Sequence, residues 1–387
     1  MLKSHDLKFE RRLIMERFIV TYRLSYIGDE ARQIAEALRI EQTIEFPYEL
    51  VTDSYIKNEI TGHLESLVAD GDTSIARISY SVETTAFEAT QFLNVVFGNS
   101  SLIPGIWVED IEVTPALLSV FKGPRFGLAE LRKLVNVPKR PMLQAVIKPM
   151  GTSPESLARM CEAYTLGGAD VIKDDHGITN QSFSTFENRV KCCAAAVQEA
   201  NAKCGGHTLY AANVSADGHT VLERAYRAKE LGATALMVAP ALIGYGWLHA
   251  LATDENLKLP IISHPAFMGG FALPGMSGIN QEIYMGVLPR LFGADMSIFV
   301  SYGGRFTFTA EACQRIHHML TKPYEEVKAS CPGPGGGVTA ERLPVLADIY
   351  GNDVMYLVGG DMFRRGSDLQ DNMQCFIELL HNLTKEV

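Results

Sequence analysis

Residues 171–176 read Val171-Ile172-Lys173-Asp174-Asp175-His176, a short apolar run that ends in charged or titratable side chains. This pattern is typical of a strand that leaves a buried parallel sheet at its carboxyl end. Side chains alternate between the two faces of a strand, so Lys173 and Asp175 face one way while Asp174 starts on the other face. With His176 beside them, these groups are suited to binding a divalent cation or poising a base, and a structural ion pair is the alternative.

Segments of the same kind recur through the C-terminal two thirds of the chain. A glycine that ends a helix precedes a buried strand at residues 166–170, 231–234, 292–295 and 350–353, with about 60 residues between successive glycines. A βα unit takes roughly 30 residues, so the whole region holds eight units. The expected strands are 143–149, 169–175, 208–214, 235–239, 259–264, 296–300, 327–331 and 354–358, with helices between them such as 183–202 and 221–231. We therefore predict an α/β protein with a C-terminal (β/α)₈ (TIM) barrel over residues 122–387, and a doubly wound open sheet is the alternative.

The N-terminal part of the chain predicts a smaller α+β domain of ferredoxin-like type over residues 16–121. Its expected elements are a strand at 18–24, a helix at 29–38, extended segments at 60–68 and 73–82, and a helix at 85–96. Residues 1–15 are polar and charged, which suggests a disordered extension.

Composition excludes several classes of protein. The 387 residues carry a formal net charge of -10 and 47% hydrophobic residues, which argues for a globular protein and against a nucleic-acid or anionic-membrane partner. No apolar run reaches the roughly 18 residues of a membrane span. The seven cysteines include no CxxC pair and are odd in number, so we expect a reduced, cytoplasmic protein.

The residues expected at the carboxyl ends of the strands suggest a site for a phosphorylated small molecule. Lys148 follows the first strand next to Lys173 on the second, and the positive charge of one lysine lowers the pKa of the other. Asn213, His264 and Arg305 follow the third, fifth and sixth strands. The loops after the seventh and eighth strands are rich in glycine and include Gly336, Gly337, Gly359 and Gly360. Barrels often hold phosphate in these two loops, where backbone N–H groups can approach an anion closely.

Four stretches carry a family resemblance. Ile147–Pro149, Gly167–Asp175, Gly335–Gly337 and Gly359–Gly360, in this order and spacing, resemble the large subunit of ribulose-bisphosphate carboxylase (RuBisCO). The chain looks like one of the RuBisCO-like (type IV) proteins of that superfamily.

The resemblance implies a role for each residue of the expected site. Lys173 would be carbamylated by CO2 and would bind Mg²⁺ together with Asp175, with His176 in the third ligand position. Lys148 matches the lysine that takes up and returns protons during enolisation, and His264 matches an active-site histidine. Gly336, Gly337, Gly359 and Gly360 match phosphate-loop positions, and Asn213 is a further candidate for substrate binding. The resemblance also implies a homodimer in which Glu41 and Asn99 of one subunit complete the site of the other.

The sequence departs from the carboxylases at four positions of the site. His176 replaces a glutamate, although Mg²⁺ prefers oxygen ligands. The nearest cation to the lysine expected after the sixth strand is Arg305, whose planar fork suits a phosphate or a carboxylate. Met150 and Pro265 replace a second lysine and an arginine. Carboxylation of ribulose bisphosphate is therefore not expected.

The residues retained from the family suffice for proton abstraction next to a carbonyl group. The first hypothesis is an isomerase that enolises a phosphorylated ketose resembling methylthioribulose 1-phosphate. The alternative is a decarboxylase or transcarboxylase/hydrolase of a phosphorylated 3-oxo sugar acid, with Arg305 binding the carboxylate. A second alternative is a non-catalytic regulatory or stress-related protein.

Overall fold

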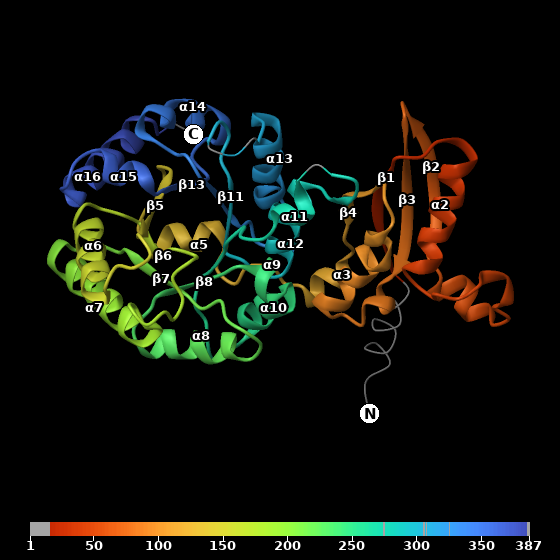
Figure 1. Cartoon of the computed structure of the whole chain (residues 1–387), viewed down its shortest axis with the longest axis horizontal. Helices are drawn as coiled ribbons and strands as arrows, with labels where there is room; N and C mark the ends of the chain where they lie inside the picture. The colour runs from red at the N-terminus through yellow and green to blue at the C-terminus, as the bar shows by residue number, and fades with distance from the viewer. Residues whose placement is uncertain (1–15, 274, 305, 307, 325, 385–387) are drawn as a thin grey trace. The chain divides into compact units, whose positions relative to one another are not determined.

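The computed structural model of the chain describes residues 16–384 except 274, 305, 307 and 325. The chain divides into two compact units (Figure 1). One unit holds the chain up to Lys122 together with Met268–Tyr284, and the other holds Gly123–Phe267 and the chain from Met285 onward. The sequence analysis treated residues 122–387 as one continuous domain and did not anticipate the segment Met268–Tyr284. The expected extension at residues 1–15 lies outside the described residues.

The first unit is built on a five-stranded sheet whose strand order is β10-β4-β1-β3-β2. Its strands are β1 (Arg17–Leu24), β2 (His63–Asp70), β3 (Thr73–Ser81), β4 (Ile106–Glu112) and β10 (Gly278–Ile279), and the α-helices among its described residues are α2 (Gly28–Glu41), α3 (Ala89–Phe97), α4 (Pro115–Val120) and α11 (Gly269–Ala272). The pairs β1–β3, β1–β4 and β2–β3 are antiparallel. Alternate residues of β1 are buried because one face of the sheet forms the core of the unit. The chain order β1-α2-β2-β3-α3-β4 is that of a ferredoxin-like domain, as predicted.

Strand β10 extends this sheet at the edge formed by β4. Its two residues pair in parallel with β4, Gly278 opposite Trp107 and Ile279 opposite Val108. The backbone N–H of Asn280 donates to the carbonyl of Val108 (2.9 Å). A two-residue strand is too short to produce a detectable sequence pattern, so the addition was missed.

The second unit contains eight parallel strands surrounded by helices (Figure 1). The strands are β5 (Met142–Ile147), β6 (Val171–Asp174), β7 (Leu209–Asn213), β8 (Ala235–Val238), β9 (Ile261–Ser263), β11 (Met296–Val300), β12 (Cys331–Gly335) and β13 (Met355–Val358). The helices are α5 (Gly127–Leu134), α6 (Pro154–Leu166), α7 (Phe186–Cys204), α8 (Thr220–Glu230), α9 (Pro240–Ile243), α10 (Tyr245–Thr253), α12 (Leu288–Leu291), α13 (Ala310–Thr321), α14 (Leu343–Tyr350), α15 (Gly360–Arg364) and α16 (Leu369–Asn382). Pairing runs in the order β12-β11-β9-β8-β7-β6-β5-β13, and the two end strands β12 and β13 contact each other. The predicted (β/α)₈ barrel is confirmed.

The seventh barrel strand differs from its prediction. It was expected at residues 327–331, whereas β12 covers Cys331–Gly335. The carbonyl groups of Val327 and Lys328 accept hydrogen bonds from the buried guanidinium of Arg290, so they do not take part in the sheet. Proline and glycine are rare inside strands, and the sequence Cys-Pro-Gly-Pro-Gly therefore argued against the correct assignment. A Cβ atom on Gly335 would lie only 2.8 Å from Leu357 Cδ2, which explains the glycine there.

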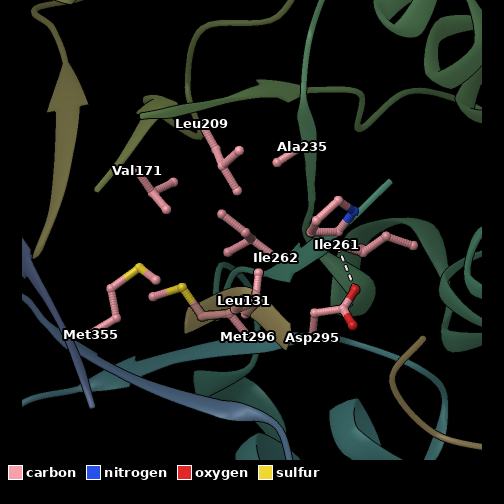
Figure 2. Close-up of a pocket in the computed structure, with 10 residues that line it drawn as sticks. Leu131, Val171, Leu209, Ala235, Ile261, Ile262, Asp295, Met296 and Met355 are labelled. Carbon is pink, nitrogen blue, oxygen red and sulfur yellow. Dashed lines mark hydrogen bonds between the residues drawn. The ribbon is translucent and has the colours of Figure 1, made fainter. Parts of the chain in front are cut away.

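The barrel interior is filled by apolar side chains from alternate positions of the strands, among them Val146, Met237, Ile298 and Leu357. A cavity of about 10 Å³ remains between residues such as Val171, Ile262 and Met296 (Figure 2). The carboxylate of Asp295, which also lines this cavity, accepts hydrogen bonds from the backbone N–H groups of Phe126, Gly127 and Ile261 (2.7–2.8 Å). The cavity lies near the amino ends of the strands and has room for about one water molecule, so it is not a substrate site.

Candidate active site

Lys173 lies at the centre of the site. It is on β6, two residues after Val171 of the interior cluster, and therefore projects into the barrel. The side chain is 1% exposed, and its Nζ donates to the carbonyl oxygen of Asp174 (2.9 Å). Burial lowers the pKa of Lys173 to about 8; the Asp175 carboxylate opposes this change, and the positive charge of Lys148 adds to it. A neutral amine is therefore accessible near physiological pH at this position.

Lys148 brings a second amine to the same end of the barrel. It directly follows β5, and its Nζ lies 3.8 Å from Oδ2 of Asp175. A Cβ atom on Gly359 would lie 3.6 Å from the same Nζ, so this amine also lies next to the backbone that follows β13. Unlike Lys173, Lys148 is only partly buried, which leaves its amine within reach of a ligand.

Two histidines complete this cluster. Nδ1 of His176 is 3.2 Å from Oδ1 of Asp175, and the ring of His176 stacks on that of His264 with 4.3 Å between ring centroids. Burial, followed by the positive charges of Lys173 and His176, lowers the pKa of His264 well below its usual value. Burial raises the pKa of Asp175, but the hydrogen bond with His176 and the two lysine charges outweigh it, and the pKa of Asp175 falls below its usual range.

Asp174 is fully buried on the opposite face of β6. Its carboxylate accepts hydrogen bonds from Nε of Arg189 (3.1 Å), from the hydroxyl of Tyr210 (2.8 Å) and from the backbone N–H of Asn213 (2.9 Å). Arg189 comes from α7 and Tyr210 from β7, and both are buried. The sequence analysis placed Asp174 on the other face but did not identify its partners. The sequence does indicate that Asp174 has such partners, because a charged residue on the strand face that packs against helices needs a buried partner.

Asn213 extends this buried network to the site loop. Its Nδ2 donates to the carbonyl oxygens of His176 (3.0 Å) and Ile178 (3.1 Å), and its Oδ1 accepts from the backbone N–H of Ser215 (3.1 Å). The sequence analysis proposed Asn213 as a substrate-binding residue. The amide is engaged with the chain and positions the loop that carries His176, and substrate binding by Asn213 stays a prediction.

The glycine loops follow β12 and β13. Gly336 and Gly337 have φ angles of +83° and +133°, which L-amino acids with a Cβ atom rarely adopt. Gly360 begins the short helix α15, and a Cβ atom there would meet nothing within 4 Å. Their binding of phosphate stays a prediction.

The sequence analysis missed Arg342, which bonds to two of the loops around the site. Its guanidinium donates to the carbonyl oxygens of Tyr302 and Gly303 after β11, and to that of Gly337 (3.4 Å) after β12. Arg342 therefore ties these two loops together. Arg305, the cation expected in the first of them, lies outside the described residues.

Glu41 and Asn99 belong to the first unit. Nδ2 of Asn99 donates to Oε1 of Glu41 (3.0 Å), so the two residues that the resemblance assigns to a partner's site lie together. Their contribution to another subunit stays a prediction.

The three expected magnesium ligands lie together at the end of β6. Oδ1 of Asp175 faces His176 and Oδ2 faces Lys148, while Lys173 presents an amine rather than an oxygen. Across the described parts of the chain, no three His, Cys, Asp or Glu side chains are grouped to hold a metal ion. Mg²⁺ requires near-octahedral oxygen ligands; Asp175 supplies a carboxylate, Lys173 would supply an oxygen ligand only when carbamylated, and His176 offers a nitrogen. Binding of Mg²⁺ by Lys173, Asp175 and His176 stays a prediction.

The eight-stranded parallel barrel, with Lys148 and Lys173 at the ends of β5 and β6, defines the chain as an α/β barrel protein with two amines at one end of the barrel. Residues 127–366 match the family described as "Ribulose bisphosphate carboxylase large chain, catalytic domain". The chain belongs to this family, among its RuBisCO-like (type IV) proteins.

Relatives and a solved structure agree with this assignment. The crystal structure of a Rubisco-like protein from Rhodopseudomonas palustris has a TM-score of 0.86 and 34% identity, covering 96% of this chain and 99% of that chain. The 5-methylthioribulose-1-phosphate isomerase of Rhodospirillum rubrum is 31% identical over 364 residues, 94% of this chain and 96% of the relative. The 2,3-diketo-5-methylthiopentyl-1-phosphate enolase of Geobacillus thermodenitrificans is 32% identical over 288 residues, 74% of this chain and 70% of the relative. The described residues include no helix that is both long and apolar enough to cross a membrane.

Proposed function

We propose that the protein is an isomerase that enolises a phosphorylated ketose by proton transfer and does not carboxylate ribulose bisphosphate. The observation that carries the proposal is the pair of amines at the ends of β5 and β6. Lys173 is buried with its pKa lowered to about 8, and Lys148 is accessible beside Asp175. Two amines of this kind can supply a base together with a positive charge for a developing enediolate.

The geometry favours separate tasks for the two lysines. Lys148 is the base, because a ligand at the mouth of the barrel can reach its Nζ while Lys173 is enclosed. The Lys173 amine, when protonated, stabilises the negative charge that forms on the substrate. The partly buried His264 is held neutral, and its Nδ1 accepts a hydrogen bond from the backbone N–H of Ala266 (3.1 Å). Its Nε2–H is then a donor for the carbonyl oxygen of the substrate.

The proposed substrate has one phosphate and an apolar end, as methylthioribulose 1-phosphate does. The names of the Rhodospirillum and Geobacillus relatives support this class of substrate. Met150 and Phe267 are 54% and 67% exposed in the loops after β5 and β9, where they offer apolar contact. The Cε of Met150 would lie 2.8 Å from a Cβ atom on Gly177, so Met150 lies over the loop that follows His176. The glycines after β12 and β13 are the proposed phosphate site.

We extend the proposal to a homodimer in which Glu41 and Asn99 reach the site of the other subunit. Their mutual hydrogen bond and their exposure on the first unit are compatible with this role. A mass of two chains in native mass spectrometry would support it, and a monomeric active enzyme would contradict it.

The test is deuterium exchange at a carbon of the substrate. Incubation with 5-methylthioribulose 1-phosphate in D₂O should introduce deuterium at a carbon next to the carbonyl, as followed by NMR. Lys148→Met should reduce this exchange by at least about 100-fold, since general base catalysis contributes about 10²–10⁴-fold. The control is Lys191→Met, which removes an exposed amine on α7 and should leave exchange unchanged.

An exchange rate that survives in Lys148→Met would refute the assignment of the base. Release of CO2 from a phosphorylated 3-oxo acid, without exchange of the ketose, would show the decarboxylase reaction instead.

A further inference from the structure

The loops that follow β7, β8 and β9 contain no lysine or arginine. They comprise residues 214–219, 239–244 and 264–267, and the only carboxylate side chain in them is that of Asp217. The three strands are neighbours in the barrel, so their loops form a continuous part of its mouth, which we call the β7–β9 wall. This wall therefore lacks the two side chains that bind phosphate most strongly in proteins.

The β7–β9 wall lies across the barrel mouth from the glycine loops. In the ring of eight strands, β12 and β13 contact each other and are separated from β7 and β8 by β5 and β6 on one side and by β9 and β11 on the other. Lys148 and Lys173 stand at the ends of β5 and β6, between the two. A substrate held by its phosphate at the glycine loops would therefore extend past the two amines toward this wall.

Hydrogen bonds join the three loops of the wall. The backbone N–H of Ala239 donates to the hydroxyl oxygen of Ser215 (3.1 Å), and that of His264 donates to the carbonyl oxygen of Val238 (2.8 Å). The backbone N–H of Ala266 donates in turn to Nδ1 of His264 (3.1 Å). These bonds connect the end of each strand to the next, so the fold sets the shape of the wall.

Two apolar side chains of the wall are exposed. Leu242 lies in α9 and is 59% exposed, and Phe267, at the end of the loop after β9, is 67% exposed. Apolar side chains stabilise a fold by leaving water, so folding gains little from either residue. Their apolar surface remains available for contact with a ligand.

The backbone of Phe267 is strained as well. Its φ angle is +71°, in the left-handed region that glycine adopts without strain and a bulky side chain rarely adopts. An aromatic residue here costs backbone strain and gains little burial, so stability does not explain its presence. Strained residues cluster at sites that bind ligands, which indicates a role for the ring in binding.

We infer that Phe267 and Leu242 are specificity-determining residues, which receive the end of the substrate far from the phosphate and select an uncharged, apolar group there. The inference rests on the proposed function and deepens it, because it assigns the apolar end to the β7–β9 wall and gives the reason why a second phosphate is rejected.

The selection follows from the cost of removing polar groups from water. A second phosphate placed against Phe267 and Leu242 would lose hydration without gaining a lysine or arginine partner, and Asp217 adds a negative charge to the wall. A hydroxyl group would lose hydrogen bonds to water at a smaller cost. An alkyl or thioether group loses little hydration and buries apolar surface.

The first test compares 5-methylthioribulose 1-phosphate with ribulose 1-phosphate, which has a hydroxyl group in place of the methylthio group. In wild-type protein, kcat/KM for deuterium exchange should be about 10–200-fold higher with the methylthio compound, the range found for small apolar groups in a hydrophobic pocket. Phe267→Asn should lower this ratio at least about tenfold, and Leu242→Asn should lower it in the same direction. Asparagine adopts positive φ angles more readily than other residues with a Cβ atom, so Phe267→Asn keeps the backbone and removes the ring.

Two controls separate lost selectivity from lost structure. Leu134→Asn replaces another exposed leucine, at the end of α5, and should leave the ratio unchanged. Phe267→Leu retains an apolar side chain and should keep most of the preference. The urea midpoint of Phe267→Asn should equal that of the wild type, because the ring is mostly exposed.

The second test uses ribulose 1,5-bisphosphate as a competitive inhibitor of exchange. Wild-type protein should bind it at least about tenfold more weakly than 5-methylthioribulose 1-phosphate. Leu242→Lys adds a cation to the wall and should tighten inhibition by the bisphosphate about two- to fivefold, as expected for an exposed ion pair. Leu134→Lys should not change it.

Wild-type protein that exchanges the two ketoses equally well, or a ratio that Phe267→Asn leaves unchanged, would overturn the inference while the exchange itself supports the proposed function. Binding of the bisphosphate as tight as that of the methylthio compound would also overturn it. Wild-type protein that exchanges neither ketose would refute the proposed function, and the inference with it.

Discussion

The substitution Tyr210→Phe tests whether the buried network behind β6 supports the site. It removes one hydroxyl group whose hydrogen bond to Oδ1 of Asp174 is 2.8 Å long and leaves the ring in place. Tyr210 and Asp174 are both fully buried, so water cannot replace the lost donor. A hydrogen bond to a charged group contributes about 1.5–3 kcal/mol, and we expect the free energy of unfolding to fall by about 2 kcal/mol.

The measurement is urea unfolding of the wild-type protein and the variant at pH 7. The matched control is Tyr226→Phe, which removes a tyrosine hydroxyl from Oδ2 of Asp254 (2.6 Å) at a solvated position. Its loss should be clearly smaller, because water solvates the remaining carboxylate. We also expect a lower rate of conversion in Tyr210→Phe, since Asp174 binds the backbone of Asn213, and Asn213 binds the His176 loop. A loss of stability no larger than that of Tyr226→Phe would refute the reasoning.

Two further predictions concern the second strand and the glycine before it. The pKa of Lys173 is lowered on folding, so the unfolded chain binds more protons between about pH 8 and pH 10.5, and stability should rise with pH through this window. The free energy of unfolding is measured for wild type and for Lys173→Met between pH 8 and pH 9.5. The difference between the two should rise by at most about 1.4 kcal/mol per pH unit. A difference that does not change with pH would show that the amine is not buried. Gly167→Ala should cost about 1–3 kcal/mol in urea unfolding, because its Cβ would lie 2.6 Å from Met373 Cβ and 2.7 Å from the carbonyl oxygen of Gln370 in α16. The control Gly270→Ala, which meets no atom within 4 Å, should change stability little, and an equal effect would contradict the packing argument.

The barrel could be predicted because its strands follow a simple physical pattern. Each strand buried on both sides is an apolar run, and a glycine at the end of a helix precedes several of them. The pattern failed at β12, where prolines and glycines form the strand and the carbonyl groups of the preceding Val327 and Lys328 accept hydrogen bonds from Arg290. It also failed at β10, whose two residues form a strand only because the edge of β4 accepts them.

Strand alternation likewise predicted part of the site. It placed Lys173 and Asp175 on one face and Asp174 on the other, as the structure has them. It could not supply Arg189 and Tyr210, because a buried carboxylate does not specify in the sequence which helix or strand provides its partner. Asn213 was found at the end of its strand, but its amide could be assigned to the loop only when its acceptors were known.

His176 shows how one substitution can change the task of its neighbour. A glutamate at this position would add a second carboxylate beside Asp175, and the two negative charges would require a cation between them. An imidazole instead donates a hydrogen bond to Asp175, and the nearby amines of Lys148 and Lys173 supply positive charge. Each oxygen of the Asp175 carboxylate thus faces a nitrogen, Oδ1 that of His176 and Oδ2 that of Lys148. The stretch that carries the family resemblance most specifically is thus followed directly by the residue at which we expect the chemistry to differ.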